Sequence, residues 1–336
     1  MSNFSTNDVL RRLAFWVFFA LVGFITLAAL FADMGKVKTL IATISPASLA
    51  AIIAAVLFNY ALRFVKWSYF LRRLNIEISF RDSLWTFFSA FTMVLSPGKL
   101  GEVIKSVILK SRYGLPISQT APIVLAERLT DLLGLICLAA IGSSRFAFGG
   151  RTLIMASILI IGGLAIMTRP KFWEACDRHI FSRFARLARF RPSLHAIEQS
   201  TGNLLSAPSL LLTVPLSALS WAGEGVALYI IFGALGVSLP ELLGISLFAH
   251  AFSSIVGALS FLPGGLLVTE GTLGMFFVFV GIGRDQAVSA TLLIRTVTLW
   301  FAVILGTIVF LAGRRPSDLV AFPVSAGAGN SDITKA

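Results

Sequence analysis

Residues 242–280, LLGISLFAHAFSSIVGALSFLPGGLLVTEGTLGMFFVFV, form a long apolar run that is interrupted by Pro263, Gly264 and Gly265. A membrane crossing needs about 20 mostly apolar residues, and each side of the break supplies only part of this run. Proline removes a helical hydrogen-bond donor and glycine frees the backbone. We therefore expect two half-helices joined by a turn, a re-entrant hairpin over residues 241–281.

The composition of the whole chain agrees with a membrane protein. Of 336 residues, 57% are hydrophobic and 13% are charged, and the mean hydropathy is +0.87. Ordinary soluble domains contain about 25% charged residues. The composition excludes a soluble globule and a disordered chain, and it predicts an all-α polytopic membrane protein.

Six further apolar runs are long enough to cross the bilayer, and one more is broken by Pro97 and Gly98. The broken run predicts a second re-entrant hairpin, over residues 82–112. The run at 13–32 follows two arginines, as in a signal peptide, but it is longer than the apolar region of a signal peptide and no small-x-small cleavage site ends it. We therefore interpret it as an uncleaved anchor. Full spans are predicted at residues 13–32, 47–65, 118–141, 152–167, 210–235 and 287–312.

The net charge of +12 is unevenly divided between the predicted loops. With the N-terminus in the cytoplasm, most basic residues fall in cytoplasmic loops, as the positive-inside rule requires. We therefore expect both termini in the cytoplasm, with the first hairpin opening inward and the second outward. The loops assigned to the cytoplasm contain Arg11, Arg12, Arg63, Lys66, Arg72, Arg73, Arg81, Lys110, Arg112, the basic residues of 169–191, Arg314, Arg315 and Lys335.

The two hairpins resemble each other. The stretch 97–102, PGKLGE, is echoed by PGGL at 263–266 with Glu270 shortly after, and each glutamate precedes an arginine by 25 or 26 residues, Arg128 and Arg295. Three full crossings in each half would invert the second copy, so we predict an inverted-topology repeat. Its parts are residues 1–145 (first repeat), 146–168 with 209–315 (second repeat), 169–208 (cytoplasmic insert) and 316–336 (tail).

Charged residues inside membrane segments are costly and should be paired or face water. Glu127 and Asp131 share a helix face and would repel without a cation between them. For the two arginines, two interpretations stay open: a clamp on an anionic headgroup, or neutralisation of the hairpin glutamates. The predicted substrate-binding or translocation residues are Lys99, Glu102, Lys105, Glu127, Arg128, Asp131, Glu270 and Arg295; Lys99, Lys105 and Arg295 are the candidate cations for the acidic pair.

Two other groups have weaker signals. Glu224 lies among small residues and is a candidate for proton coupling or for pairing with an arginine. His250 could relay a proton, although a lone histidine is more typical of packing. The sequence contains no metal-ligand cluster, nucleotide loop or catalytic set, so we expect no metal, no cofactor and no enzymatic activity.

The insert at 169–191 mixes basic residues with aromatic ones. Positions 173, 180, 184 and 187 fall on one helical face, which predicts a basic amphipathic helix lying on anionic lipid. Next to a span we prefer this interpretation to nucleic-acid binding. A purely topological role is the alternative.

These motifs resemble the lysylphosphatidylglycerol synthase transmembrane, or flippase-like, family, from the first span to the last. The matching elements are PGKLGE at 97–102, AERLTDLLG at 126–134, LPGGL at 262–266 with Glu270, and LIR at 293–295. The resemblance implies a stand-alone version of the module that, in multifunctional bacterial resistance factors, moves aminoacylated phospholipids between leaflets; it does not imply the identity of the lipid. The chain departs from the family in having Leu267 where another glycine is frequent, and no soluble transferase domain is expected after Arg315.

The sequence thus favours a flippase or scramblase for an anionic, aminoacyl, glycosyl or polyprenyl lipid. The alternatives are a proton-coupled exporter of a small amphiphile and a membrane scaffold for a lipid-modifying transferase. Expected partners are membrane lipids, an anionic lipid surface and such an enzyme, with no nucleic acid. The expected location is a bacterial inner membrane.

Overall fold

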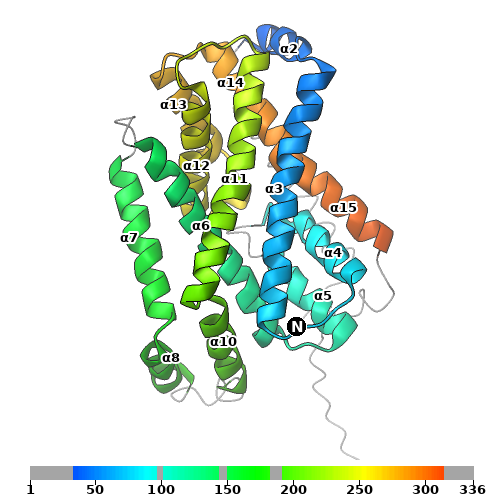
Figure 1. The fold of residues 1–336 in the computed structure, drawn as a ribbon, viewed down its shortest axis with the longest axis vertical. Helices are drawn as coiled ribbons and strands as arrows, with labels where there is room; N and C mark the ends of the chain where they lie inside the picture. The colour runs from blue at the N-terminus through cyan, green and yellow to red at the C-terminus, as the bar shows by residue number, and fades with distance from the viewer. Residues whose placement is uncertain (1–32, 97–100, 144–149, 182–190, 314–336) are drawn as a thin grey trace, which may run out of the picture.

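The computed structural model describes residues 33–96, 101–143, 150–181 and 191–313, and these are helical with short connections (Figure 1). The elements are α2 (Met34–Ala42), α3 (Pro46–Arg73), α4 (Phe80–Ser89), η1 (Ala90–Met93), α5 (Ile104–Tyr113), α6 (Ile117–Ser143), α7 (Gly150–Met167), α8 (Pro170–Cys176), η3 (Asp177–Phe181), α10 (Arg191–Leu204), α11 (Ala207–Ala234), α12 (Leu242–Leu259), η4 (Pro263–Gly265), α13 (Val268–Phe279), α14 (Arg284–Arg295), η5 (Thr296–Trp300) and α15 (Phe301–Gly313).

Among the described residues, five helices are long and apolar enough to cross a membrane, where the sequence predicted six spans. Four coincide with predicted spans: α3, α7, α11 and the continuous helix Arg284–Gly313. The fifth is α12, which was predicted only as a hairpin arm but has 18 residues. Helix α6 forms as predicted, but three charged residues near its centre keep it out of this set, and the predicted span 13–32 lies outside the described residues.

Helix α3 is longer than the predicted span because its apolar pattern continues beyond Val65. It begins with Ser45 as N-cap and Pro46 in the first turn, and it ends at Arg73. Arg63 and Lys66, which we expected in a cytoplasmic loop, are therefore inside the helix and buried. This correction places two cations in the interior.

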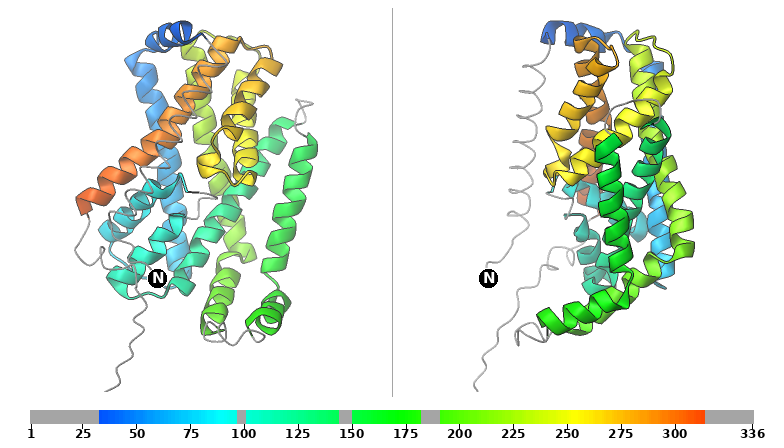
Figure 2. Two further views of the ribbon diagram at one scale, coloured as in Figure 1. Left: turned by 180° about the vertical axis from the view of Figure 1, so that it is seen from behind. Right: turned by 90° about the vertical axis from the view of Figure 1, so that its left-hand side faces the viewer.

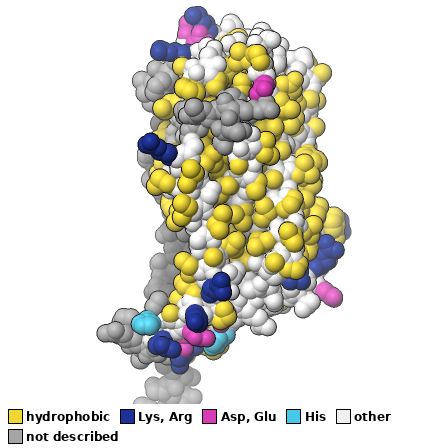
Figure 3. Space-filling model, turned by 60° about the vertical axis from the view of Figure 1, so that its left-hand side comes forward, with side chains coloured by type: hydrophobic (Ala, Val, Ile, Leu, Met, Phe, Trp, Pro, Cys, Tyr) yellow, Lys and Arg dark blue, Asp and Glu magenta, His cyan; other side chains and the backbone are white. Residues whose placement is uncertain are grey.

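The surface between the two ends of the molecule is mainly apolar (Figure 3). Helix α7 illustrates this, because Ile154, Met155, Ile158 and Leu159 are each more than 60% exposed. A soluble protein rarely shows such a continuous apolar surface, whereas a lipid-facing helix requires one. On the face drawn in Figure 3, the charged side chains are concentrated toward the ends.

The two arms of each broken run pack against each other, and the first arm of one run ends beside the turn of the other. Seen from behind, α12 and α13 occupy the upper half and α4 and α5 the lower half (Figure 2). Leu95, at the end of the first arm of one hairpin, packs with Leu266, after the turn of the other, in a small apolar cluster with Leu299. Gly264 has a φ of 60°, which favours glycine, and a Cβ there would lie 2.9 Å from Leu95 Cδ2.

The second turn also contains a departure from ideal geometry. Leu267, which stands where the resemblance predicts a further glycine, has a φ of 69° directly before α13. A non-glycine residue in this region is strained. The side chain is 48% exposed, so the strain is not offset by deep burial.

The described parts of the insert, on either side of residues 182–190, are helical. Helix α8 continues into the π-helical η3, and α10 begins at Arg191, where its guanidinium donates to Asp177 at 2.6 Å. This hydrogen bond lowers the pKa of the Asp177 carboxyl. Positions 184 and 187 of the predicted amphipathic face lie outside the described residues, so that helix stays a prediction.

We predict that Gly134→Ala destabilises the contact between α6 and α11. A Cβ at Gly134 would lie 2.6 Å from the backbone nitrogen of Ala218, which cannot rotate away. Overpacking of this kind costs about 1–3 kcal/mol, measurable as a shift in SDS-induced unfolding in mixed micelles. The matched control is Gly162→Ala in α7, where a Cβ meets nothing within 4 Å; equal shifts for both variants would contradict the prediction.

Candidate functional site

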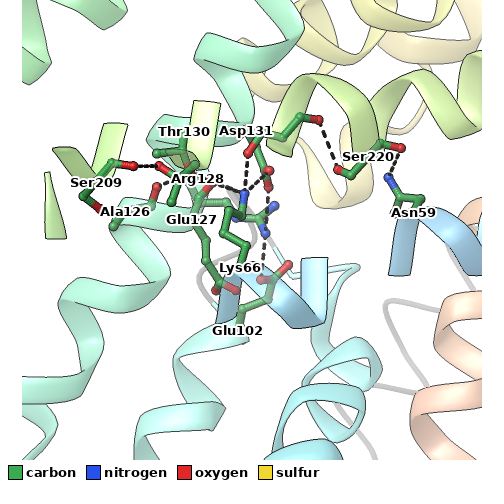
Figure 4. Close-up of polar contacts among 12 residues, drawn as sticks. Asn59, Lys66, Glu102, Ala126, Glu127, Arg128, Thr130, Asp131, Ser209 and Ser220 are labelled. Carbon is green, nitrogen blue, oxygen red and sulfur yellow. Dashed lines mark hydrogen bonds and ion pairs between the residues drawn. The ribbon is translucent and has the colours of Figure 1, made fainter. Parts of the chain in front are cut away.

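Six buried or nearly buried ionisable residues form one network around the middle of α6 (Figure 4). They come from three parts of the chain: α3, the start of the second arm of the first hairpin, and α6. We call them the α6 network. Its members are Lys66, Glu102, Lys105, Glu127, Arg128 and Asp131, three cations and three carboxylates.

Lys66 joins α3, α6 and α11. Its ammonium forms a short ion pair with Asp131 and donates to Ser217 Oγ at 2.7 Å and to Thr130 Oγ1 at 3.3 Å. The side chains of Lys66 and Asp131 are 1% and 3% exposed. Because an ammonium has three donors, these contacts use its full hydrogen-bonding capacity.

The other half of the network links the first hairpin to α6. Lys105 Nζ lies 2.7 Å from Glu127 Oε2 and 3.8 Å from Glu102 Oε2. Arg128 lies 3.1 Å from Glu102 and 3.4 Å from Asp131. Each carboxylate therefore has at least one cation, and charges of opposite sign alternate through the network.

Buried aromatic rings lie close to the cations. Lys105 Nζ lies 4.9 Å from the centre of the Trp67 ring and 5.1 Å from that of Phe87. The Arg63 guanidinium lies 5.5 Å from the centre of Phe91. Cation–π contacts stabilise such charges in a low-dielectric setting.

The second hairpin carries a smaller counterpart, which we call the α13 pair. Arg295 Nε donates to Glu270 Oε1 at 2.5 Å, and its Nη2 donates to the carbonyl oxygen of Gly264 at 2.7 Å. The arginine therefore holds both the second arm and the turn of its hairpin. Glu102–Arg128 and Glu270–Arg295 are equivalent pairs, with glutamate on the second arm and arginine on the following helix.

A third group, the α11–α12 pair, lies between two neighbouring helices. His250 Nε2 lies 3.0 Å from Glu224 Oε2, although not in hydrogen-bond geometry, and both side chains are 7% exposed. The Trp221 ring is 5.9 Å from the His250 ring. The two residues were singled out separately from the sequence, and only the packing of α11 on α12 brings them together.

The structure distributes the predicted site residues among these groups. Of the candidate cations for Glu127 and Asp131, Lys105 pairs with Glu127. The prediction that Arg295 could serve them is wrong, because Arg295 pairs with Glu270. Pro97, Gly98 and Lys99 lie outside the described residues.

Lys66 is the main site residue that sequence reasoning missed. It was assigned to a loop because the predicted span ended at Val65. The signal was present, since Phe64, Val65, Trp67 and Phe70 continue the apolar pattern of a buried helix around it.

Among the described residues, no group of three or more His, Cys, Asp or Glu side chains could hold a metal ion. The ionisable groups instead neutralise one another. What the arrangement can do chemically is exchange ion-pair partners, because an incoming anion can replace a carboxylate on a guanidinium. The fold and site therefore define a multi-pass helical membrane protein with two charged, broken-helix hairpins.

Comparison with known proteins identifies the family. The profile of the lysylphosphatidylglycerol synthase TM region matches residues 13–306, so the chain belongs to this family. A UPF0104 membrane protein of Pyrococcus horikoshii is 26% identical over 283 residues, covering 75% of this chain and 82% of the relative. One of Methanocaldococcus jannaschii is 28% identical over 238 residues, covering 67% and 95%. A third, of Methanothermobacter thermautotrophicus, is 22% identical over 311 residues, covering 85% and 91%.

These results confirm the resemblance seen in the sequence and the multi-pass membrane character. The three relatives are archaeal, so the expected bacterial origin is not shown.

Proposed function

We propose that this protein moves a lipid with an anionic headgroup between the two leaflets, by means of an inverted-topology repeat. Two observations carry the proposal: the first arm of one hairpin, at Leu95, packs with Leu266 after the turn of the other, and each hairpin carries an equivalent Glu–Arg pair. Broken helices that meet near the midplane are the usual site of alternating access. The family name, which refers to a lipid synthase, supports a lipid substrate.

The two arginines are the groups we propose to bind the headgroup. Their side chains are 18% and 11% exposed, whereas Glu102 and Glu270 are 1% and 2% exposed. Arg128 Nε also donates to no acceptor among the described residues. A phosphate oxygen would satisfy this donor, and a guanidinium binds phosphate through two hydrogen bonds.

The orientation in the membrane forms part of the proposal. The exposed cations Arg72 and Arg73 at the end of α3, and those of α8 and α10, lie at one end of the molecule (Figure 1). We assign this end to the cytoplasm by the positive-inside rule. There the insert would lie on anionic lipid, and the protein would act by binding and moving lipid, without catalysis, cofactor or nucleic acid.

A lipid-translocation assay tests the proposal. Purified protein is reconstituted into vesicles that contain fluorescently labelled phosphatidylglycerol, and dithionite removes the label in the outer leaflet. The protein should make the inner-leaflet label accessible. Arg128→Gln should reduce the initial rate at low lipid fraction roughly 10- to 100-fold, since a hydrogen bond to a charged group contributes about 1.5–3 kcal/mol. Arg81→Gln, at an exposed arginine of α4, is the matched control.

A double variant separates the two interpretations of Arg128. If the arginine only neutralises Glu102, then Arg128→Gln combined with Glu102→Gln restores a neutral interior and should restore transport. If Arg128 binds the headgroup, the rate stays low in the double variant, and this is the result we expect. Folded wild-type protein that moves no labelled aminoacyl, glycosyl or phosphatidylglycerol lipid would exclude the flippase and favour a scaffold for a partner transferase.

A further inference from the structure

Among the described residues, the buried charged side chains and the partly buried members of ion pairs balance. Together they are six cations and six carboxylates, with a formal sum of zero while histidine is neutral. The buried members are Arg63, Lys66, Lys105, Glu102, Glu127, Asp131, Glu224 and Glu270, and the partly buried members are Asp82, Arg112, Arg128 and Arg295.

A neutral interior creates a difficulty for an anionic substrate. A headgroup that bears one negative charge would leave the site with a charge of −1. An uncompensated charge within a membrane is costly, and the cost falls when a positive charge enters with it. The arginines and lysines of this set cannot supply that extra charge, because the sum already counts each of them as a cation.

His250 is the buried group in the described part of the chain that can add a positive charge. Histidine is the side chain whose ordinary titration lies between pH 5 and 8. Its Nε2 lies 3.0 Å from Glu224, and its Nδ1 has no hydrogen-bond partner among the described residues. Neither ring nitrogen has a hydrogen-bond partner among the described residues, so a proton can be added without breaking an existing hydrogen bond, and the carboxylate of Glu224 lies close enough to pair with the ring.

Two groups of α3 face the α11–α12 pair. Tyr60 interacts electrostatically with Glu224, and Arg63 lies 6.0 Å from the centre of the Trp221 ring. Tyr60 donates its own hydroxyl to the carbonyl of Thr298.

Helix α12 also packs against α6 and α13. The buried charged groups of these two helices each have an ion-pair partner of their own. These groups are Glu127, Arg128, Asp131 and Glu270.

We propose that Glu224 and His250 form a proton-binding site, and that one proton accompanies each singly charged anionic headgroup. The proposal rests on the proposed lipid translocation. The proton comes from water on the side where the headgroup enters, resides on the His250 imidazole beside Glu224, and leaves to water on the other side. The combined movement is electroneutral, so it depends on the pH gradient and not on the membrane potential.

Vesicles with an imposed pH gradient test this coupling. The probe is labelled phosphatidylglycerol, which bears one negative charge, and the membrane potential is held at zero with valinomycin and equal potassium. One-to-one coupling predicts that the steady-state ratio of label between the leaflets changes about tenfold per pH unit. In Glu224→Gln and in His250→Asn the ratio should no longer respond to the gradient. The control is His195→Asn, at an exposed histidine that should leave the response intact.

A second measurement reports protonation without transport. The chain has three histidines, so isotope labelling of histidine yields an NMR spectrum in which His250→Asn identifies the buried ring. At fixed pH, short-chain phosphatidylglycerol should shift the His250 signal toward imidazolium, and short-chain phosphatidylcholine should not.

The outcomes separate the two proposals. Lipid movement without a response to the pH gradient would overturn the proton site and leave the flippase intact. A response to membrane potential at zero pH gradient would overturn electroneutral coupling. An absence of lipid movement in folded protein would overturn both.

Discussion

Lys66→Met is expected to cause one of the largest losses of stability available from a single substitution in this protein. The change removes the cation of the ion pair with Asp131 and the donor to Ser217, while the side chain of Asp131 stays 3% exposed. Breaking a buried pair by removal of one partner costs about 3–5 kcal/mol, because the remaining charge is uncompensated. SDS-induced unfolding in mixed micelles, followed by circular dichroism, measures the loss.

A double variant shows whether the loss of stability in Lys66→Met comes from the unpaired charge of Asp131. Lys66→Met combined with Asp131→Leu removes both partners, and replacement of a buried pair by apolar residues is often close to neutral. We therefore expect the double variant to recover most of the lost stability. Lys110→Met, at an exposed position of α5, is the control. A Lys66→Met protein as stable as this control would show that the α6 network does not hold the helices together.

Arg295→Met is expected to destabilise the second hairpin. The arginine holds Glu270 at 2.5 Å and the Gly264 carbonyl at 2.7 Å, so its loss frees the second arm and the turn together. Glu270 is 4% exposed, and its Oε2 already accepts no hydrogen bond from the described residues. The expected loss is again about 3–5 kcal/mol, with faster hydrogen exchange confined to the turn and the start of α13.

Two further variants distinguish the contribution of charge neutralisation to stability from that of the guanidinium hydrogen bonds in the α13 pair. Glu270→Gln combined with Arg295→Met should recover part of the stability, because no buried charge remains. Arg295→Lys should recover less than full stability, since a lysine cannot reproduce the two divergent contacts of a guanidinium. Arg284→Met, at an exposed position in the first turn of α14, is the control. If Arg295→Met leaves hydrogen exchange at the turn unchanged, Arg295 does not stabilise the turn.

Much of the architecture could be predicted from the sequence because it depends on local properties. Apolar length predicted four of the five candidate spans, and Pro263 with its glycines predicted the turn between α12 and α13. The structure pairs each arginine with the glutamate that the repeated interval connects to it, although from the sequence this pairing was one of two open interpretations. The boundary at Val65 was wrong because a lysine was interpreted as the end of a span, although neighbouring helices supply partners that let a cation stay inside.

The site was harder to predict from the sequence, because most of its contacts join segments that are distant along the chain. Lys66 and Asp131 are 65 residues apart, and His250 was interpreted as a packing residue while its partner Glu224 lay on another helix. No local pattern encodes these pairs. They arise where the interhelical packing leaves two polar groups without access to water, so that each must be satisfied by the other.

By itself, the sequence determined that the chain is a helical membrane protein with two broken apolar runs, because hydropathy and the backbone restrictions of proline and glycine act over a few residues. Only the tertiary structure decided that Leu95 packs with Leu266, that Lys66 neutralises Asp131, and that Glu224 faces His250. The physical reason is that a buried charge needs a partner within a few ångströms, and the packing of the helices selects which side chains come that close.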